Sequence, residues 1–420
     1  MTIATRIADY VHPRIAAVYE NSAAEAAFWQ WVTAHGAPLI EADPASPDHS
    51  LVTYVWQTCA SERYVVVQPG CGDAPGNLMT RIAGTGLCFA SYRMRNDLRT
   101  SYSFAPDMPL FAWDAAEADD LAALNEYART HPPRHDPLHR EFAVSRAAQG
   151  QDETLTSILS LPAAPDESLV AKRPQVARGA LQKHEFTSEL LGNTRRLWVY
   201  TPPGYEMGSL DHPVLVAFDG GVCVSQIPMH RMLDNLLADG RIRATVAVFI
   251  DNVTATSRNV ELPCNETFAR FIDTELLPWL RANHRVSRAP ADHFVAGASY
   301  GGLAAMWLGY RLPHVFGNVI SQAASLWWGP GYDLDVPRSA GGYQPEWLTG
   351  QFENAPRTAV RFWMEIGLLE HGLLMRAPNR RMHALLQRKG YDVVFSEPCG
   401  GHDTALWRGT MAQALAKMLA

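Results

Sequence analysis

The stretch Val295-Ala-Gly-Ala-Ser299-Tyr-Gly-Gly302 contains the pattern Gly-x-Ser-x-Gly, centred on Ser299. This pattern is typical of a nucleophilic serine on a sharp turn between a strand and a helix. Residues 293–296 predict a short buried strand before the serine, and residues 303–310 have helical spacing after it. A chance match is the alternative, because the chain has 30 glycines. A strand and a helix on the expected sides favour a catalytic serine.

Apolar runs alternate with helical patterns from about residue 180 to the end of the chain. Continuous apolar runs are typical of buried parallel strands, whereas an alternating pair of segments predicts a hairpin. The hairpin is expected at 183–188 and 195–201, and the further strands at 213–219, 245–251, 293–296, 315–321, 360–366 and 391–396. The alternation predicts an α/β fold, with an α/β-hydrolase domain and a mostly parallel sheet over residues 179–420.

The first part of the chain has a period of two instead. A helix is expected at 19–35, and β-rich segments separated by turns follow at 51–56, 63–68, 87–92 and 99–104. This spacing predicts a smaller β-sandwich domain over residues 1–150, joined to the second domain by a proline-containing linker at 151–178. The sandwich has no group of titratable residues suited to chemistry, so we expect it to pack against the second domain or to cover a substrate.

The composition indicates which classes of partner and which cellular compartment to expect. A net charge of −7 argues against a nucleic acid or an anionic membrane as partner. The chain has no run of 18 apolar residues and starts without the pattern of a signal peptide, so we expect a cytoplasmic protein. Six scattered cysteines without a C-x-x-C pair predict free thiols, and we expect neither a metal site nor a cofactor. The oligomeric state stays open.

The catalytic partners of the serine follow from chain order. In this fold the order is serine, then acid, then histidine. His402 follows the last strand and two glycines, so it is the expected general base. Glu370 lies in the loop after the preceding strand and is the expected acid. The alternative is a Ser–His dyad with Glu370 as a solvated loop residue; Glu365 and Asp403 are weaker candidates for the acid.

An oxyanion hole requires two backbone N–H groups. One is expected from Tyr300, which follows the serine. The other is expected from Gly220 or Gly221, in the loop after an early strand. The alternative for this Asp-Gly-Gly segment is an ordinary turn.

Several longer motifs carry a resemblance to a known family. They are Arg258-x-x-Glu-Leu-Pro-Cys-Asn265, Ser321-Gln-x-x-Ser325-x-Trp-Trp328, Gly400-Gly-His-Asp-x-x-x-Trp-Arg-Gly409 and, in the first domain, Arg81-Ile-Ala-Gly-Thr85, Ser101-Tyr-x-Phe104 and Asp136-Pro-Leu138. With them, residues 50–415 resemble the bacterial enterochelin (enterobactin) esterases, which cleave the trilactone of catecholate siderophores in the cytoplasm. The resemblance implies a serine esterase with Ser299, His402 and Glu370 at the family's catalytic positions.

The implied substrate suggests further contacts. A ferric catecholate is a flat aromatic anion, and arginine suits it because the guanidinium stays charged and stacks on rings. Arg258 is the expected catecholate contact, and Trp327 and Trp328 are expected to wall the pocket. Alternatively, Arg258 pairs only with Glu261, and the tryptophans belong to the core.

Three hypotheses for the function follow. The first is an esterase acting on a catecholate siderophore, in its ferric or iron-free form. The second is a general carboxylesterase or acyltransferase of the same fold with another acyl substrate, because fold does not determine substrate. The third is a siderophore- or carbohydrate-binding sandwich attached to an inactive hydrolase, against which the retained serine, histidine and glycine-rich turns argue.

Overall fold

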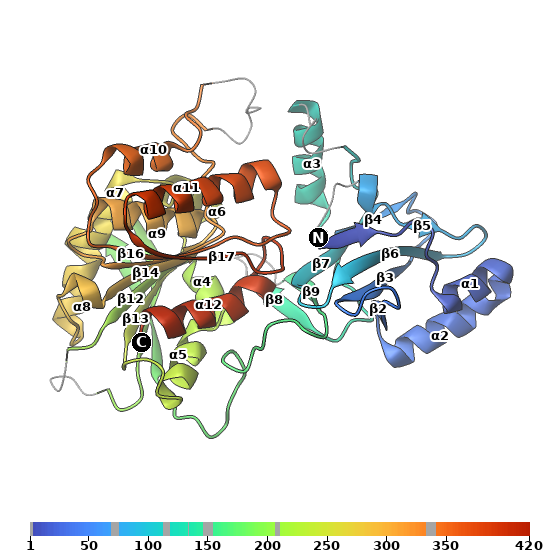
Figure 1. Cartoon of the computed structure of the whole chain (residues 1–420), viewed down its shortest axis with the longest axis horizontal. Helices are drawn as coiled ribbons and strands as arrows, with labels where there is room; N and C mark the ends of the chain where they lie inside the picture. The colour runs from blue at the N-terminus through green and yellow to red at the C-terminus, as the bar shows by residue number, and fades with distance from the viewer. Residues whose placement is uncertain are drawn as a thin grey trace.

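The central sheet of the second half explains where Ser299 lies. The computed structural model describes residues 3–68, 75–111, 118–132, 134–145, 154–205, 211–332 and 342–420. Within them, eight strands form one sheet in the order β10-β11-β13-β12-β14-β15-β16-β17 (Figure 1). The strands are β10 (Ala180–Ser188), β11 (Asn193–Thr201), β12 (Val214–Phe218), β13 (Val246–Ile250), β14 (His293–Ala298), β15 (Asn318–Gln322), β16 (Arg361–Glu365) and β17 (Asp392–Ser396). Pairing is antiparallel from β10 to β13 and parallel from β13 to β17, so the predicted α/β sheet is confirmed.

Helices cover both faces of this sheet because successive strand residues point to opposite sides. In β12, Val214 and Val216 belong to one core cluster, and Leu215 and Ala217 belong to the other. On the second face lie α4 (Gly220–Ser225), α5 (Met229–Ala238) and α12 (Thr404–Met418). On the first face lie α6 (Ala255–Glu261), α7 (Glu266–Phe271), α8 (Leu277–Asn283), α9 (Tyr300–Arg311), α10 (Trp347–Asn354) and α11 (Ala377–Arg388), with helical turns at Ile272–Leu276 and Gly372–Arg376 (Figure 1).

The first half of the chain is an antiparallel sandwich, as predicted. One sheet contains β1 (Ala4–Arg6), β6 (Leu87–Arg95), β3 (His49–Gln57) and β2 (Leu39–Ala42) in that order, with β5 (Thr80–Arg81) paired to β6. The other has the order β4 (Val65–Gln68), β7 (Arg99–Pro106), β9 (Thr154–Ser160), β8 (Phe142–Ser145). Tyr54 and Tyr92 from the first sheet pack with Tyr102 and Phe104 from the second in one core. Helices α1 (Pro13–Glu20), α2 (Glu25–His35) and α3 (Ala118–Thr130) flank the sheets.

Two expectations for this half need correction. The single helix expected at 19–35 is two helices, because Asn21 adopts an extended conformation and its side chain accepts the N–H of Ala23, which starts a short turn at Ser22–Ala24.

The expected linker also contains β9, which pairs with β7 inside the sandwich. We propose that the first domain extends through β9 and that the linker follows it.

Two further features are the absence of a membrane-spanning helix among the described residues and the state of the cysteines. No helix in the described ranges is long and apolar enough to cross a membrane. Five cysteines, at positions 59, 88, 223, 264 and 399, are free thiols, whereas Cys71 lies outside the described residues.

Candidate active site

Ser299 lies at the junction of β14 and α9, in a strained conformation. Its backbone has φ 58° and ψ −121°, a positive φ that is uncommon for serine. Close packing explains the neighbouring glycines: a Cβ atom on Gly297 would lie 2.4 Å from the carbonyl carbon of Gly301. On Gly302, it would lie 2.7 Å from the carbonyl oxygen of Gln322. Only glycine allows the helix to start this close to the strand, and strand and helix present the serine on a tight elbow.

His402 and Glu370 form a direct pair. The Nδ1 atom of His402 is 2.9 Å from both carboxylate oxygens of Glu370. The Glu370 side chain is only 1% exposed, whereas that of His402 is 40% exposed. A carboxylate is an acceptor, so Nδ1 carries the proton and donates it, which leaves Nε2 with a free lone pair. This is the tautomer that a general base acting on a serine requires.

Backbone contacts hold the two loops that carry this pair. The N–H groups of Leu368 and Leu369 donate to the carbonyl oxygens of Pro398 and Gly400, each at 2.9 Å. The loops after β16 and β17 therefore continue side by side beyond the sheet. A Cβ atom on Gly367 would lie 2.5 Å from the carbonyl oxygen of Gly400, so a side chain there would push the loops apart.

Ser299, Glu370 and His402 line one cleft of about 630 Å³ between the two domains. The sandwich contributes polar side chains to the same cleft, namely Gln68, Ser101, Ser103 and Thr156. The covering role expected for the sandwich thus fits the geometry. In the sequence these four residues carry little signal apart from the Ser101-Tyr-x-Phe104 motif. The hydroxyl oxygen of Ser299 also lies 3.4 Å from that of Ser325, a second neighbour that only the motifs had pointed to.

Asp403 ties the histidine loop to the sandwich. Its carboxylate accepts hydrogen bonds from the Thr100 hydroxyl at 2.8 Å and from the Ser101 N–H at 3.1 Å. The same side chain caps α12 by accepting the N–H of Leu406 at 3.0 Å. Asp403 is therefore bound to β7 of the other domain, and Glu370 is the carboxylate that contacts His402.

Of the residues expected for the oxyanion hole, Tyr300 and Gly220 stay candidates. Tyr300 is the first residue of α9 and directly follows Ser299. The Gly221 N–H donates to Asp251 at 3.1 Å and is therefore engaged, contrary to the expectation that either glycine could serve. Gly220 follows Asp219, whose φ is 58°, and a Cβ atom on Gly220 would lie 2.8 Å from the carbonyl oxygen of Phe249. Gly220 remains the candidate for the second amide.

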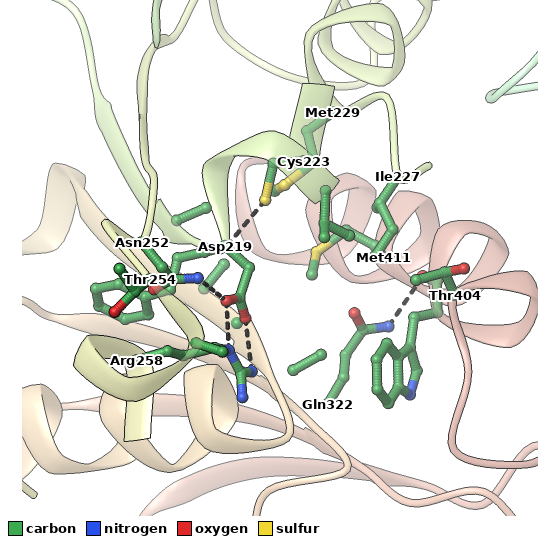
Figure 2. A pocket seen from close by; sticks show the side chains of 18 residues that line it. Asp219, Cys223, Ile227, Met229, Asn252, Thr254, Arg258, Gln322, Thr404 and Met411 are labelled. Carbon is green, nitrogen blue, oxygen red and sulfur yellow. Dashed lines mark hydrogen bonds and ion pairs between the residues drawn. The ribbon is translucent and has the colours of Figure 1, made fainter. Parts of the chain in front are cut away.

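Arg258 lies elsewhere than expected. Its guanidinium forms two hydrogen bonds with Asp219, at 2.6 and 2.8 Å (Figure 2). Both residues line a separate cavity of about 330 Å³ that reaches Gln322 and Met411 behind the elbow. The alternative pairing with Glu261 is also wrong, because that carboxylate binds Arg195 at 2.8 Å. Arg258 is already neutralised, so it is not a free cation in the cleft.

The two tryptophans differ in position. Trp327 lines the cleft with Ser299, and its ring centroid lies 6.0 Å from that of Tyr300. Trp328 is half-buried and packs against the core on the α9 face, without being part of the cleft lining. One of the two expected walls therefore faces the cleft, and the core alternative fits Trp328.

The serine elbow lies at the end of a central parallel strand, and the acid and the histidine lie on the loops after later strands. This arrangement defines the class of protein, an α/β-hydrolase. Residues 188–418 match the family described as putative esterase, and residues 51–170 match the N-terminal domain of enterochelin esterase. The chain belongs to the enterochelin esterase family and is an esterase, a carboxylic ester hydrolase.

Relatives cover nearly the whole chain. The iron(III) enterobactin esterase of Dickeya dadantii is 30% identical, with 92% of this chain and 91% of that protein covered. The enzyme of the same name from Escherichia coli K12 is 28% identical, with 89% and 88% covered. Among solved structures, the ferric enterobactin esterase from Salmonella typhimurium has a TM-score of 0.76 at 28% identity and covers 94% of this chain and 98% of that chain. The Shigella flexneri enterobactin esterase, crystallised in the presence of enterobactin, has a TM-score of 0.73 at 26% identity, with 93% and 97% covered.

Proposed function

We propose that this protein hydrolyses the ester bonds of a catecholate siderophore trilactone of the enterobactin type, in the cytoplasm, so that iron can be released. The observation that carries the proposal is the cleft that holds the Ser299 elbow and the His402–Glu370 pair beneath the sandwich. The iron(III) enterobactin esterases share both domains with this chain, so the sandwich that borders the cleft is part of the similarity.

The proposed reaction has two halves. The Ser299 hydroxyl attacks an ester carbonyl while Nε2 of His402 takes its proton, and the N–H groups of Tyr300 and Gly220 stabilise the oxyanion. The intermediate collapses as His402 protonates the leaving serine alkoxide of the trilactone. In the second half, His402 activates a water molecule that releases the acyl group from Ser299. The first ester cleaved opens the ring, and each further cleavage uses one more water and shortens the chain.

The test is chromatography of ferric and iron-free enterobactin after incubation with the wild type and the Ser299→Ala variant. We expect linear trimer and smaller fragments with the wild type, and a loss of at least about 10³-fold in rate for Ser299→Ala. Ser22→Ala, at an exposed position in the first domain, is the matched control and should keep full activity.

Two results would contradict the proposal in different ways. Intact trilactone together with cleavage of a p-nitrophenyl ester by the wild type would leave a serine esterase with another acyl substrate. Equal cleavage of the trilactone by the wild type and Ser299→Ala would remove the nucleophile from the mechanism.

A further inference from the structure

A second cavity, of about 810 Å³, lies between the two domains beside the catalytic cleft. Its walls come from β8, β11, α4, α5, the start of α12 and the linker. We call it the basic cavity, because its described lining contains four cationic side chains and no acidic one. These cations are Lys172, Arg196, Arg231 and Arg408.

Two of the four cations have counter-charges and two do not. Arg196 pairs with Asp251, and Arg408 pairs with Glu141 and Glu167. Within the described residues, no carboxylate forms an ion pair with Lys172 or Arg231. The Arg231 guanidinium donates to the carbonyl oxygen of Val170 at 3.1 Å. The basic cavity therefore presents two positive charges that nothing in its lining neutralises.

The electrostatics of Arg231 agree with this imbalance. Burial lowers the pKa of Arg231, and the positive charge of Arg178 lowers it further. The nearby carboxylate of Asp234 raises the pKa of Arg231, but this effect is smaller than the two that lower it. One oxygen of Asp234 already accepts hydrogen bonds from the Tyr200 hydroxyl and the Gly179 N–H. A half-buried cation of this kind gains from an anion placed beside it.

Aromatic side chains form part of the same walls. The Arg196 guanidinium lies 5.4 Å from the ring centroid of Trp198, which lines the basic cavity. Phe142 also lines it and is 49% exposed, so its ring is open to a ligand. Aromatic faces between cations suit a flat, negatively charged ring.

The basic cavity borders the catalytic cleft at two places. Ala143 of β8 lines the basic cavity, and its direct partner Thr156 in β9 lines the cleft. Directly paired residues lie on the same face of a sheet about 5 Å apart, so the two spaces border each other at this strand pair. On the other side, Gln226 of the basic cavity accepts a hydrogen bond from Thr404, two residues after His402, at 2.9 Å. Figure 1 shows β8 next to the start of α12.

We propose that the basic cavity binds the iron(III)-catecholate end of the substrate while Ser299 attacks an ester in the adjoining cleft. This inference rests on the proposed function and deepens it. Iron(III) bound by catecholates carries several negative charges, whereas iron-free catechols are mostly protonated near neutral pH. Lys172 and Arg231 therefore make the enzyme discriminate between the ferric and iron-free forms of one substrate.

The first test compares Lys172→Met with the wild type by kcat/KM on ferric and on iron-free enterobactin. We expect the ratio of the two values, ferric over iron-free, to fall roughly 10-fold, chiefly through KM for the ferric form. Lys183→Met, an exposed lysine on β10, is the matched control and should keep the wild-type ratio. Arg231→Gln should lower the ratio in the same direction. A ratio that both variants leave unchanged overturns the inference.

A binding measurement keeps this test separate from that of the esterase reaction. Ferric and iron-free enterobactin are titrated, by tryptophan fluorescence, into the Ser299→Ala protein with and without Lys172→Met. Loss of ferric preference with Lys172→Met supports the basic cavity even if the wild type cleaves neither form. Equal affinity for both forms in Ser299→Ala overturns it even if the wild type cleaves both. Inorganic phosphate is the last probe: if it competes with both forms alike through Lys172, the basic cavity is a general anion site and the inference is wrong.

Discussion

Two glutamates near the end of β16 show how surroundings separate the roles of identical side chains. Glu370 is bound to His402, and its charge is matched whenever the imidazole gains a proton. Glu365 is also buried, but it accepts a hydrogen bond from the hydroxyl of Thr410 at 2.7 Å and forms no ion pair with any residue that the structure describes. We therefore assign the charged, orienting role to Glu370 and a neutral, structural role to Glu365.

Replacing Glu370 with glutamine tests the orienting role. Glutamine keeps the size and one acceptor but removes the charge that stabilises the imidazolium, so kcat for a p-nitrophenyl ester should fall about 10²- to 10⁴-fold. Glu353→Gln, on the exposed side of α10, is the control. A loss of less than about tenfold would mean that the enzyme works as a Ser–His dyad, because removal of a required acid costs more.

Glu365 predicts a pH dependence of stability. Burial raises the pKa of Glu365 from 4.5 to about 8, and the charge of Glu370 adds to the rise. Between pH 4.5 and about pH 8, Glu365 is ionised in the unfolded chain and protonated in the folded one. The free energy of unfolding therefore falls as the pH rises through this range. Glu365→Gln removes this titration. Urea unfolding at pH 5 and pH 8 should show a smaller loss of stability in the variant, by on the order of a few kcal/mol. If the wild type and Glu365→Gln lose the same stability between pH 5 and pH 8, the titration does not come from Glu365.

At the scale of elements, β7 of the sandwich supports the histidine loop through Asp403. Thr100→Val keeps the shape of the side chain but removes the hydroxyl that donates to this carboxylate. Because the loop then loses one anchor, we expect kcat to fall about 3- to 10-fold, with little change in KM for a small ester. Thr100→Ser should restore the rate.

The matched control for Thr100→Val is Thr53→Val. The hydroxyl of Thr53 is also buried, and it bonds to that of Ser91 at 2.9 Å within the sandwich. If both variants lose activity to the same extent, the effect is general destabilisation and Thr100 has no role in positioning the loop.

The sequence predicted the strands of the central sheet and the elbow because their signals are local: continuous apolar runs and a glycine-flanked serine. The acid and the histidine followed from chain order in the fold. The contact of Thr100 with Asp403 could not be predicted, because 303 positions separate the two residues and only the docking of the domains joins them. Arg258 was the expected catecholate contact, with pairing to Glu261 as the alternative. The fold instead brings Asp219 to it from the end of another strand, a contact that no local pattern indicated.

At the scale of the whole molecule, the linker joins the domains through an ionic cluster around Glu167. This carboxylate pairs with Arg408 of α12 and lies 3.5 Å from Arg99 of β7, so it contacts both domains at once. All three side chains are largely shielded, with exposures of 20%, 15% and 11% for Glu167, Arg408 and Arg99. Two guanidinium groups that approach each other need this negative charge between them.

Glu167→Gln should therefore loosen the contact between the domains. The change leaves the two guanidinium groups facing a neutral amide, and we expect the free energy of unfolding to fall by about 1 to 3 kcal/mol. Glu126→Gln, in an exposed pair with Arg129, should leave the free energy of unfolding nearly unchanged. Because the cleft is lined from both domains, siderophore hydrolysis should fall more than hydrolysis of a p-nitrophenyl ester that needs only the second domain. If the two activities fall in proportion, domain docking does not shape the substrate cleft, and the sandwich serves stability alone.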